Sequence, residues 1–550
     1  MNWDNLLPLL ISSSIGIAIA CYFSWRKSSL IYQLPGPPSS SFIFGNVLEI
    51  IRHESGFMIQ KWFQEYGPVI IFQDLFGASR LTMTDPKALN HILVQRSYDY
   101  PKPFEVQGEL GRLLGRGILL AEGEQHKRQR KLLNPTFSPA QLRSLVPLVY
   151  SYGQKLSAQW EEKILQNKKQ SQKCIFDVMP SINRTSLDII GEAGFAYQFH
   201  SLENGPQTAL ATAFSNLISA GGIFEGASGF QVLLIQLLRN FPSFFKIFST
   251  KRSEVMAQSL RSMEEESQKV LEKVQNVNEI HSDRKDLLAL LVRQNKLVSG
   301  ETERISNEEV IGQMTTFLFA GHETTASALT WFLWILAKNP EIQNRLRQEI
   351  FNATPSSDDE IEDSKTTWSL DQINGLSYLD AFCREGFRFT SPLTLTNRIA
   401  TRDDKIPLSK PVQLRTGKLV DHLVILAGQR VIIPIHSFNR SEEIFGKDAQ
   451  EFKPERWLKS DPPKSGTGVW SGLLTFLAGP RACIGYRFSL VEVKVLLIVL
   501  LSKFKFEERD DGGGPDFERR STVIVQPQIK GQPGKSTMPL RVSLIRNEEQ

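Results

Sequence analysis

A mostly apolar run without charged residues lies near the start of the chain, over residues 6–23. As a helix these 18 residues would rise about 27 Å, close to the thickness of an endoplasmic-reticulum bilayer. Arg26 and Lys27 follow the run, so the positive-inside bias places the rest of the chain in the cytosol. A cleaved secretory signal is the alternative, but such signals carry their positive charge before the apolar run. We therefore predict one retained transmembrane helix over residues 1–27.

The next segment is rich in proline, with the sequence Leu-Pro-Gly-Pro-Pro at residues 34–38. Proline lacks an amide hydrogen and fixes its backbone angle, so this stretch is expected to run extended. We predict a hinge over residues 28–45, followed by one folded domain over residues 46–550.

Beyond the hinge, the spacing of apolar residues is mainly that of helices, and strand signals are few. The fold class we predict is mainly α with a small β-rich subdomain. Loops are expected at 353–367, 459–472 and 509–515. The predicted helices are 56–66, 86–95, 122–133, a long one entered through Ser138 and Pro139, and 486–501; the predicted strands are 69–72, 80–84, 424–433, 523–525 and 541–545.

The longest predicted helix begins at Ser306, where Ser306 and Glu309 have the spacing of a capping box, and runs to about Ala337. It is apolar on most faces, as a helix through the centre of a domain should be. Residues 321–325, Gly-His-Glu-Thr-Thr, interrupt this pattern. A glycine beside buried polar groups is costly in a helix, so the segment indicates either a tolerated kink or a functional site.

Composition excludes several classes of protein. The chain is 41% hydrophobic and 22% charged, which is ordinary for a globular protein. Its 64 basic and 59 acidic residues leave a net charge of +5, too small a surplus to indicate a nucleic-acid binder. The four cysteines are far apart, which argues against a disulfide framework or a zinc site.

Glu385 and Arg388 lie three residues apart on a predicted helix and are expected to pair. Such a pair is most often an exposed salt bridge of little energetic weight. Arg456 offers a second guanidinium that would turn the pair into a buried network.

Cys483 lies in a segment that indicates chemistry, Phe-Leu-Ala-Gly-Pro-Arg-Ala-Cys-Ile-Gly at residues 476–485. Glycines on both sides allow backbone amides to turn toward the sulfur, a helix begins just beyond it, and Arg481 is two residues away. All three features favour a thiolate over a thiol. A purely structural cysteine is the alternative, and it would prefer apolar surroundings without donors.

Three motifs together, F-x-x-G-x-R-x-C-x-G at 476–485, A-G-x-E-T-T at 320–325 and E-x-x-R at 385–388, resemble those of the cytochrome P-450 haem-thiolate monooxygenases. The likeness covers nearly the whole chain and is closest to eukaryotic microsomal members, fungal ones in particular. It implies the cytochrome P-450 fold, preceded here by the membrane helix, and haem b as cofactor.

The resemblance also implies roles for individual residues. Cys483 matches the axial ligand of the haem iron, and Phe476 opens the haem-binding loop. Glu323 and Thr324 match an acid and an alcohol that relay protons, while Glu385, Arg388 and Arg456 match a structural brace. The remaining matches are Ala320 and Gly321, which leave room for oxygen, and Arg130, Arg398 and Arg481, which bind the haem propionates. His126 departs from the tryptophan of many relatives and is expected either to donate to a propionate or to face solvent.

No nucleotide-binding glycine motif follows a strand, so electrons must come from another protein. The resemblance implies NADPH-cytochrome P-450 reductase, with cytochrome b5 as a second candidate donor. The basic run 126–131, with Arg487 and Lys494, is the expected docking face, and the Phe-rich residues 210–250 are the expected roof of the substrate pocket.

The function we predict is insertion of one oxygen atom from O2 into a lipophilic small molecule at the endoplasmic-reticulum membrane, in secondary metabolism. Two alternatives stay open: a haem-thiolate isomerase or dehydratase that acts on a peroxide without a reductase, and a non-catalytic haem or sterol-binding protein.

Overall fold

The computed structural model describes residues 30–169, 174–205, 251–276, 286–300, 303–354, 368–509, 517–521, 524–532 and 536–545. Within them the chain folds as two compact units. One consists of the chain up to Pro101 together with Leu395–Ser437, and the other of Lys102–Thr394 together with Phe438 onward. The predicted boundaries at residues 27 and 45 stay predictions. Residue 27 and the Phe-rich residues 210–250 lie outside the described residues.

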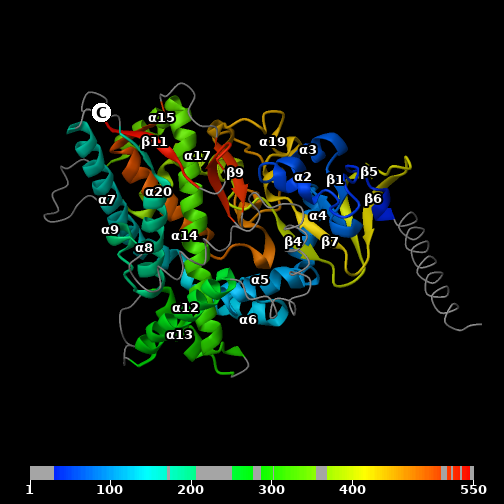
Figure 1. Cartoon of the computed structure of the whole chain (residues 1–550), viewed down its shortest axis with the longest axis horizontal. Coiled ribbons are helices and arrows are strands. Elements are labelled where there is room, and N and C mark those ends of the chain that lie inside the picture. The colour runs from blue at the N-terminus through cyan, green and yellow to red at the C-terminus, as the bar shows by residue number, and fades with distance from the viewer. Residues whose placement is uncertain are drawn as a thin grey trace, which may run out of the picture. The chain divides into compact units, whose positions relative to one another are not determined.

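The smaller unit is built around a four-stranded sheet of order β1-β2-β7-β4 (Figure 1). Its first two strands form the predicted antiparallel hairpin, and β7 joins β2 in parallel. The core packs Trp62 of α3 against Phe72 of β1, with ring centroids 5.2 Å apart. Its elements are η1 (Leu30–Gln33), α2 (Val47–Arg52), α3 (Phe57–Tyr66), β1 (Val69–Gln73), η2 (Leu75–Gly77), β2 (Ser79–Met83), α4 (Pro86–Asn90), η3 (His91–Gln95), η4 (Ser97–Asp99), β4 (Thr396–Ile399), β5 (Asp404–Gln413), β6 (Leu419–Ile425) and β7 (Arg430–Ile433).

The single strand predicted over 424–433 is wrong. The chain turns at Gly428, whose φ of +86° is a left-handed conformation that glycine adopts without strain. The residues before the turn end β6, which pairs with β5, and those after it form β7 of the other sheet.

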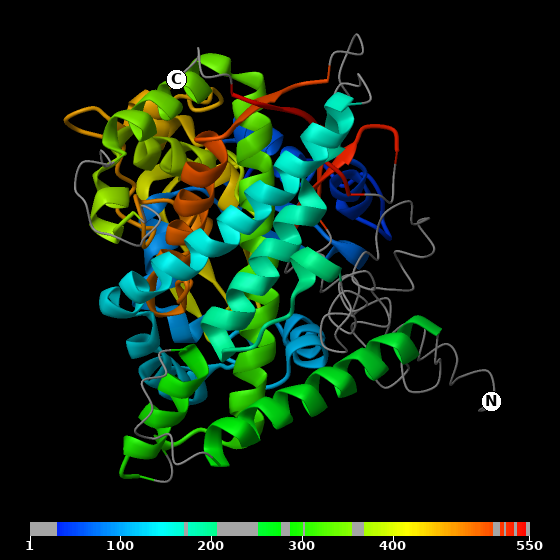
Figure 2. The ribbon, with the colours of Figure 1, turned by 90° about the vertical axis from the view of Figure 1, so that its left-hand side faces the viewer.

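The larger unit is mainly helical. Figures 1 and 2 show α14 running lengthwise through it, with α8 and α20 alongside and α12 across one end. Its elements are α5 (Phe104–Leu114), α6 (Gly123–Leu133), η5 (Asn134–Phe137), α7 (Pro139–Lys169), β3 (Ile175–Asp177), α8 (Met179–Phe195), α9 (Ser201–Asn204), α12 (Lys251–Asn276), α13 (Leu287–Leu297), α14 (Asn307–Lys338), α15 (Pro340–Ala353), α16 (Leu370–Gly375), α17 (Ser377–Phe389), α19 (Glu442–Phe445), η9 (Pro454–Trp457), η10 (Leu474–Phe476), η11 (Gly479–Arg481), α20 (Tyr486–Leu501), β8 (Phe504–Glu507), β9 (Phe517–Ser521), β10 (Val525–Ile529) and β11 (Pro539–Leu544); α18 (Ile435–Asn439) spans the passage between the units.

Two small sheets complete this unit, one of order β3-β11-β8 and one made of β9 and β10. The strand predicted over 541–545 is confirmed as β11, which begins at Pro539. The strand predicted over 523–525 is displaced, because β10 begins at Val525 and residue 523 is outside the described residues.

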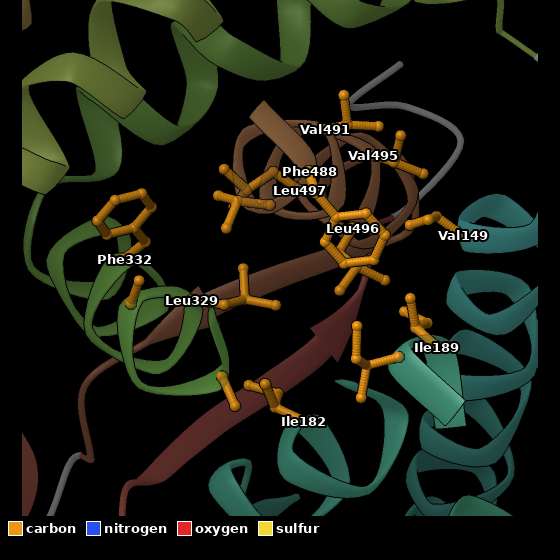
Figure 3. Packing of buried hydrophobic residues seen from close by; sticks show 14 of the residues in the cluster. Val149, Ile182, Ile189, Leu329, Phe332, Phe488, Val491, Val495, Leu496 and Leu497 are labelled. Atoms are coloured by element: carbon orange, nitrogen blue, oxygen red, sulfur yellow. The ribbon is translucent and has the colours of Figure 1, made fainter. Parts of the chain in front are cut away.

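Side chains from α7, α8, α14 and α20 meet in one apolar core (Figure 3). Leu329 and Phe332 of α14 face Leu496 and Leu497 of α20, and Ile189 of α8 closes the group. Both α14 and α20 are apolar on most faces because neighbours cover them on most sides. The two helices that carry the candidate site are therefore held together by this apolar core.

The predicted long helix is confirmed as α14, and Ser306 caps it as expected. Ser306 Oγ accepts from the Glu309 amide at 3.2 Å, while Glu309 Oε2 accepts from the Ser306 amide at 2.9 Å. The helix continues through residues 321–325, so these residues interrupt the apolar pattern and not the helix. Among the described helices none is long and apolar enough to cross a membrane, and residues 6–23 are not among those described.

Candidate haem site

The cysteine loop is a tight turn placed directly before α20. The Cys483 amide donates to the Phe476 carbonyl at 2.9 Å, and the Ala482 amide donates to the Gly479 carbonyl at 3.0 Å. Gly479 has a φ of +65°, so the turn requires a residue that tolerates the left-handed region. Leu477 has a φ of +56° without being glycine, a strain of the kind that accumulates at functional loops.

Phe476 fixes the start of this loop through its ring. The side chain is buried and lies 5.1 Å from the ring of Phe387 and 5.9 Å from that of Tyr486, measured between centroids. Its position in the core, together with its carbonyl bond to the Cys483 amide, makes it an anchor of the loop.

The Cys483 side chain is exposed although its neighbour Ala482 is buried. The protein around the sulfur raises the pKa of the thiol, while the Gly485 amide and the Arg130 guanidinium lower it. The net direction is upward, although the backbone amide favours the thiolate as we expected. A thiolate here needs a cation in front of the sulfur, which is what a metal ion provides.

Arg481, the residue we expected to act on the sulfur, pairs instead with Glu122 at the N-terminus of α6. Lys102 reaches the same carboxylate, with Nζ 3.3 Å from Glu122 Oε1. Arg130 donates to the Ala482 carbonyl at 2.5 Å, which ties α6 to the cysteine loop. These contacts bring three cationic side chains together beside the loop.

His126 lies within this group and is 3% exposed, so the alternative that it faces solvent is wrong. Burial lowers its pKa to about 3, helped by the charges of Arg481, Lys102 and Arg130. The ring is therefore neutral and keeps one N–H to donate. Lys102 and Glu122 were not among the residues we predicted, because no motif marks them and only the fold brings them to Arg481.

The position of α6 is set by polar contacts with the first turns of α14. Glu309 Oε1 accepts from Arg128 at 2.6 Å and from Gln129 at 3.0 Å, and Gln313 donates to Gln129 at 3.0 Å. Gln313 also accepts from the Ile118 amide at 2.8 Å. Since these groups are buried and bonded to one another, they fix the cationic helix relative to α14.

Ala320 and Thr324 lie one turn apart on α14 and are only half-buried, on a helix whose other residues are mostly buried. Thr324 Oγ1 donates to the Ala320 carbonyl at 2.7 Å, the back-bond common for a threonine within a helix. The hydroxyl proton is therefore held by the backbone, and its lone pairs are left to accept a hydrogen bond.

Gly321 lies where α14 packs against α8. A Cβ at this position would lie 2.8 Å from Cγ1 of Ile190 on α8. The glycine therefore permits close contact between the two helices, and the expected room for oxygen at Ala320 and Gly321 stays a prediction.

Glu323 is buried, and burial raises its pKa to about 7, while a hydrogen bond from Gln526 lowers it. Its partner is Gln526 and that of Thr324 is Ala320, so the acid and the alcohol bond in different directions. A carboxyl group that titrates near neutral pH can either give or take a proton, as a relay requires.

The predicted brace is confirmed as a buried network. Glu385 accepts two hydrogen bonds from Arg388, at 2.7 and 2.8 Å, and one from Arg456 at 3.0 Å. Both partners of the E-x-x-R pair have a side-chain exposure of 0%, so the alternative of a surface salt bridge is wrong. The network continues through the Asn439 carbonyl, and the Asn439 side chain bonds the Leu474 amide just before the cysteine loop.

Arg398 belongs to the smaller unit, on β4. Its side chain is buried and donates to the Asn397 carbonyl at 2.8 Å and to Thr396 at 3.1 Å. Its expected bond to a propionate stays a prediction.

The site fits a haem with a thiolate ligand. An open sulfur, cations and a neutral histidine beside it for two propionates, and a helix with a half-buried alcohol are the donor set that this group requires. A chain with this fold and this site has the features of a haem-thiolate protein.

Comparison with known proteins gives the family. The Cytochrome P450 family model matches residues 35–533. Cytochrome P450 monooxygenase 205 of Postia placenta is 34% identical over 96% of this chain and 97% of its own length. Cytochrome P450 monooxygenase 128 of the same fungus is 36% identical over 94% of this chain and 93% of its own length. Cytochrome P450 monooxygenase claO of Ampulloclitocybe clavipes is 34% identical over 98% of this chain and all of its own length.

The chain belongs to the cytochrome P450 family, and its relatives here are fungal. It is a haem-dependent monooxygenase, and its cofactor is haem b. The fold and cofactor that the resemblance implied are thereby confirmed.

Proposed function

We propose that this monooxygenase inserts one oxygen atom from O2 into a lipophilic small molecule of secondary metabolism, using electrons from NADPH-cytochrome P-450 reductase. The observation that carries the proposal is the exposed Cys483 in a rigid turn, with the cationic group of Lys102, Arg130 and Arg481 beside it. Haem b bound there supplies the activation of dioxygen.

The residues of the chain have separate tasks in this proposal. Cys483 holds the iron, and His126, Arg130 and Arg481 bind the propionates, with Lys102 as a further cation. Guanidinium groups suit this task because they bind carboxylates with two parallel hydrogen bonds. On α14, Glu323 has a pKa of about 7 and can hold or release a proton near neutral pH, and Thr324 accepts a hydrogen bond at the half-buried face. Arg398 is proposed as a further propionate ligand.

The reductase would dock on the basic surface that includes α6. Lys127 and Lys131 have side-chain exposures of 48% and 71% and retain ion pairs with Glu124 and Glu303. Arg487, at the start of α20, is exposed. Lys494, which we also expected on this surface, is buried against Asp380 at 2.8 Å and is excluded from it. Cytochrome b5 is a second candidate donor for the same face.

Residues 1–27 would anchor the enzyme in the endoplasmic-reticulum membrane with the folded part in the cytosol. The support is the apolar run over residues 6–23 and the two basic residues that follow it. A membrane location suits a lipophilic substrate, since the bilayer concentrates such molecules.

Turnover with and without the reductase tests the proposal. Full-length enzyme in microsomes is incubated with pooled lipophilic compounds, and products are identified by mass spectrometry. We expect products that have gained one oxygen atom and that require NADPH and the reductase. Product from a peroxide without NADPH would support the isomerase or dehydratase instead, and haem binding without any product would support a binding protein.

A further inference from the structure

Two consecutive residues of β10 are hydrogen-bonded to one face of α14. Ser327 Oγ donates to the Val525 carbonyl at 2.5 Å, and Gln526 Nε2 donates to Glu323 Oε2 at 3.3 Å. Glu323 and Ser327 are one helical turn apart, so they lie on the same face of α14. The strand is thus held in register beside the buried carboxyl group.

The orientation of the Gln526 amide is fixed by a second bond. Ser536 Oγ donates to Gln526 Oε1 at 2.6 Å, so the amide oxygen faces Ser536 and the amide nitrogen faces Glu323. An amide donates only through its nitrogen, and the bond from Ser536 therefore selects the rotamer that donates to the carboxyl group.

The other oxygen of Glu323, Oε1, lies nearest to an unprotonated nitrogen of the His322 ring. His322 Nδ1 lies 2.9 Å from the Leu318 carbonyl, an acceptor, so in the neutral ring the N–H is on Nδ1. Burial lowers the pKa of His322 to about 4, which keeps the ring neutral at neutral pH. The unprotonated Nε2 of this ring lies 3.8 Å from Glu323 Oε1.

No charged side chain of β10 faces Glu323, because this strand, Val-Gln-Pro-Gln-Ile, has none. The carboxyl groups of the neighbouring helices α8 and α20 are engaged elsewhere. Asp188 of α8 accepts from the Ser201 and Leu202 amides, Glu192 of α8 accepts from Tyr152, and Glu492 of α20 accepts from Ser186.

We propose that Gln526, oriented by Ser536, is a positioning residue for Glu323. Its amide makes Oε2 the oxygen that accepts a hydrogen bond. The exchangeable proton is then carried by Oε1, the oxygen next to the unprotonated Nε2 of His322. The proposal rests on the relay role of Glu323 given under the proposed function. Because the amide donor stabilises the ionised carboxylate, its removal must raise the pKa of Glu323.

The experiment titrates Glu323 directly in the full-length holoenzyme. The infrared carboxyl band is followed against pH, and the spectrum of Glu323→Gln is subtracted to isolate this group. Gln526→Leu removes the donor at similar volume, and Ser536→Ala removes only the bond that orients it. Ser327→Ala is the matched control, since it breaks the neighbouring contact of β10 without touching Glu323.

We expect the midpoint to rise by about one pH unit in Gln526→Leu, the size of one hydrogen bond to a charged group. Ser536→Ala should give a smaller rise, and Ser327→Ala should give none. An unchanged midpoint in Gln526→Leu overturns the proposal, as does an equal rise in Ser327→Ala, which would indicate general loosening of β10.

Turnover then separates this inference from the function on which it rests. Product formed per NADPH consumed should fall on the basic side as Glu323 loses its proton, and this fall should move to higher pH in Gln526→Leu by the same amount. If the infrared midpoint moves and the turnover profile does not, the relay role of Glu323 is refuted while its contact with Gln526 stands.

Discussion

Replacing Arg388 by lysine tests whether the buried network holds the cysteine loop. The Arg388 guanidinium donates five hydrogen bonds, two to Glu385 and one each to the carbonyls of Asn439, Ala449 and Glu451. Lysine keeps the charge but has only three donors. At least two of the five hydrogen bonds are therefore lost in Arg388→Lys.

The cost follows from these lost bonds. Each hydrogen bond lost from this charged group costs about 1.5–3 kcal/mol, so the substitution should cost about 3–6 kcal/mol. A folded domain is stable by only about 5–15 kcal/mol, which makes this a large share of the total. Because Asn439 also bonds the Leu474 amide, the loss should reach the segment that leads to Cys483.

The assay is haem retention at equal amounts of polypeptide, followed by haem absorbance against urea concentration. Arg345→Lys is the matched control, since Arg345 pairs with Glu455 at 2.8 Å while half-exposed and should cost less than about 1 kcal/mol. We expect Arg388→Lys to lose haem at a clearly lower urea concentration than the control. Equal haem content and equal midpoints in the two variants would refute the reasoning.

Four further predictions concern single features of the site and the anchor. Thr324→Ala should keep haem and substrate binding but divert NADPH consumption from product to hydrogen peroxide, whereas Thr324→Ser should stay coupled. Unchanged coupling in the alanine variant would mean that Thr324 only shapes the helix, through its bond with the Ala320 carbonyl. Cys483→Ser should abolish the red-shifted ferrous carbon-monoxide spectrum, and an unchanged spectrum would falsify the ligand assignment. Burial raises the pKa of Glu492 to about 8, so the folded state binds this proton more tightly than the unfolded state. The free energy of unfolding should therefore fall as pH rises between about 4.5 and 8, by at most about 1.4 kcal/mol per pH unit. In Glu492→Gln the urea midpoint should lose this pH dependence. Removal of residues 1–27 should weaken sedimentation with membranes and leave haem binding intact, and full sedimentation would place the membrane contact elsewhere.

The sequence predicted those parts of the fold that depend on local pattern. Ser306 and Glu309 fix the start of α14 by their spacing alone, and the apolar residues of α20 define it from end to end. The strand β5 was missed because its prolines and polar residues are atypical of a strand, and it is held by pairing with β6.

The candidate site was predictable where a motif carries the chemistry and not where contacts are long-range. Cys483 and Glu385 stand out in the sequence, whereas Lys102, Glu122 and Gln526 have meaning only through residues distant in the chain. The net direction of the thiol pKa was not predictable from the loop either, since it depends on the protein packed around the sulfur in the fold.

The bond between Arg130 and the Ala482 carbonyl joins residues 352 positions apart, which has a consequence for biosynthesis. At the usual rate of translation, α6 leaves the ribosome roughly 20–70 s before the cysteine loop exists. During that interval the cations of α6 lack Ala482 and Arg481 as neighbours, and Cys483 is not yet present to bind iron. Haem must therefore be bound late, after most of the chain has been synthesised, so assembly of the enzyme requires haem at that stage.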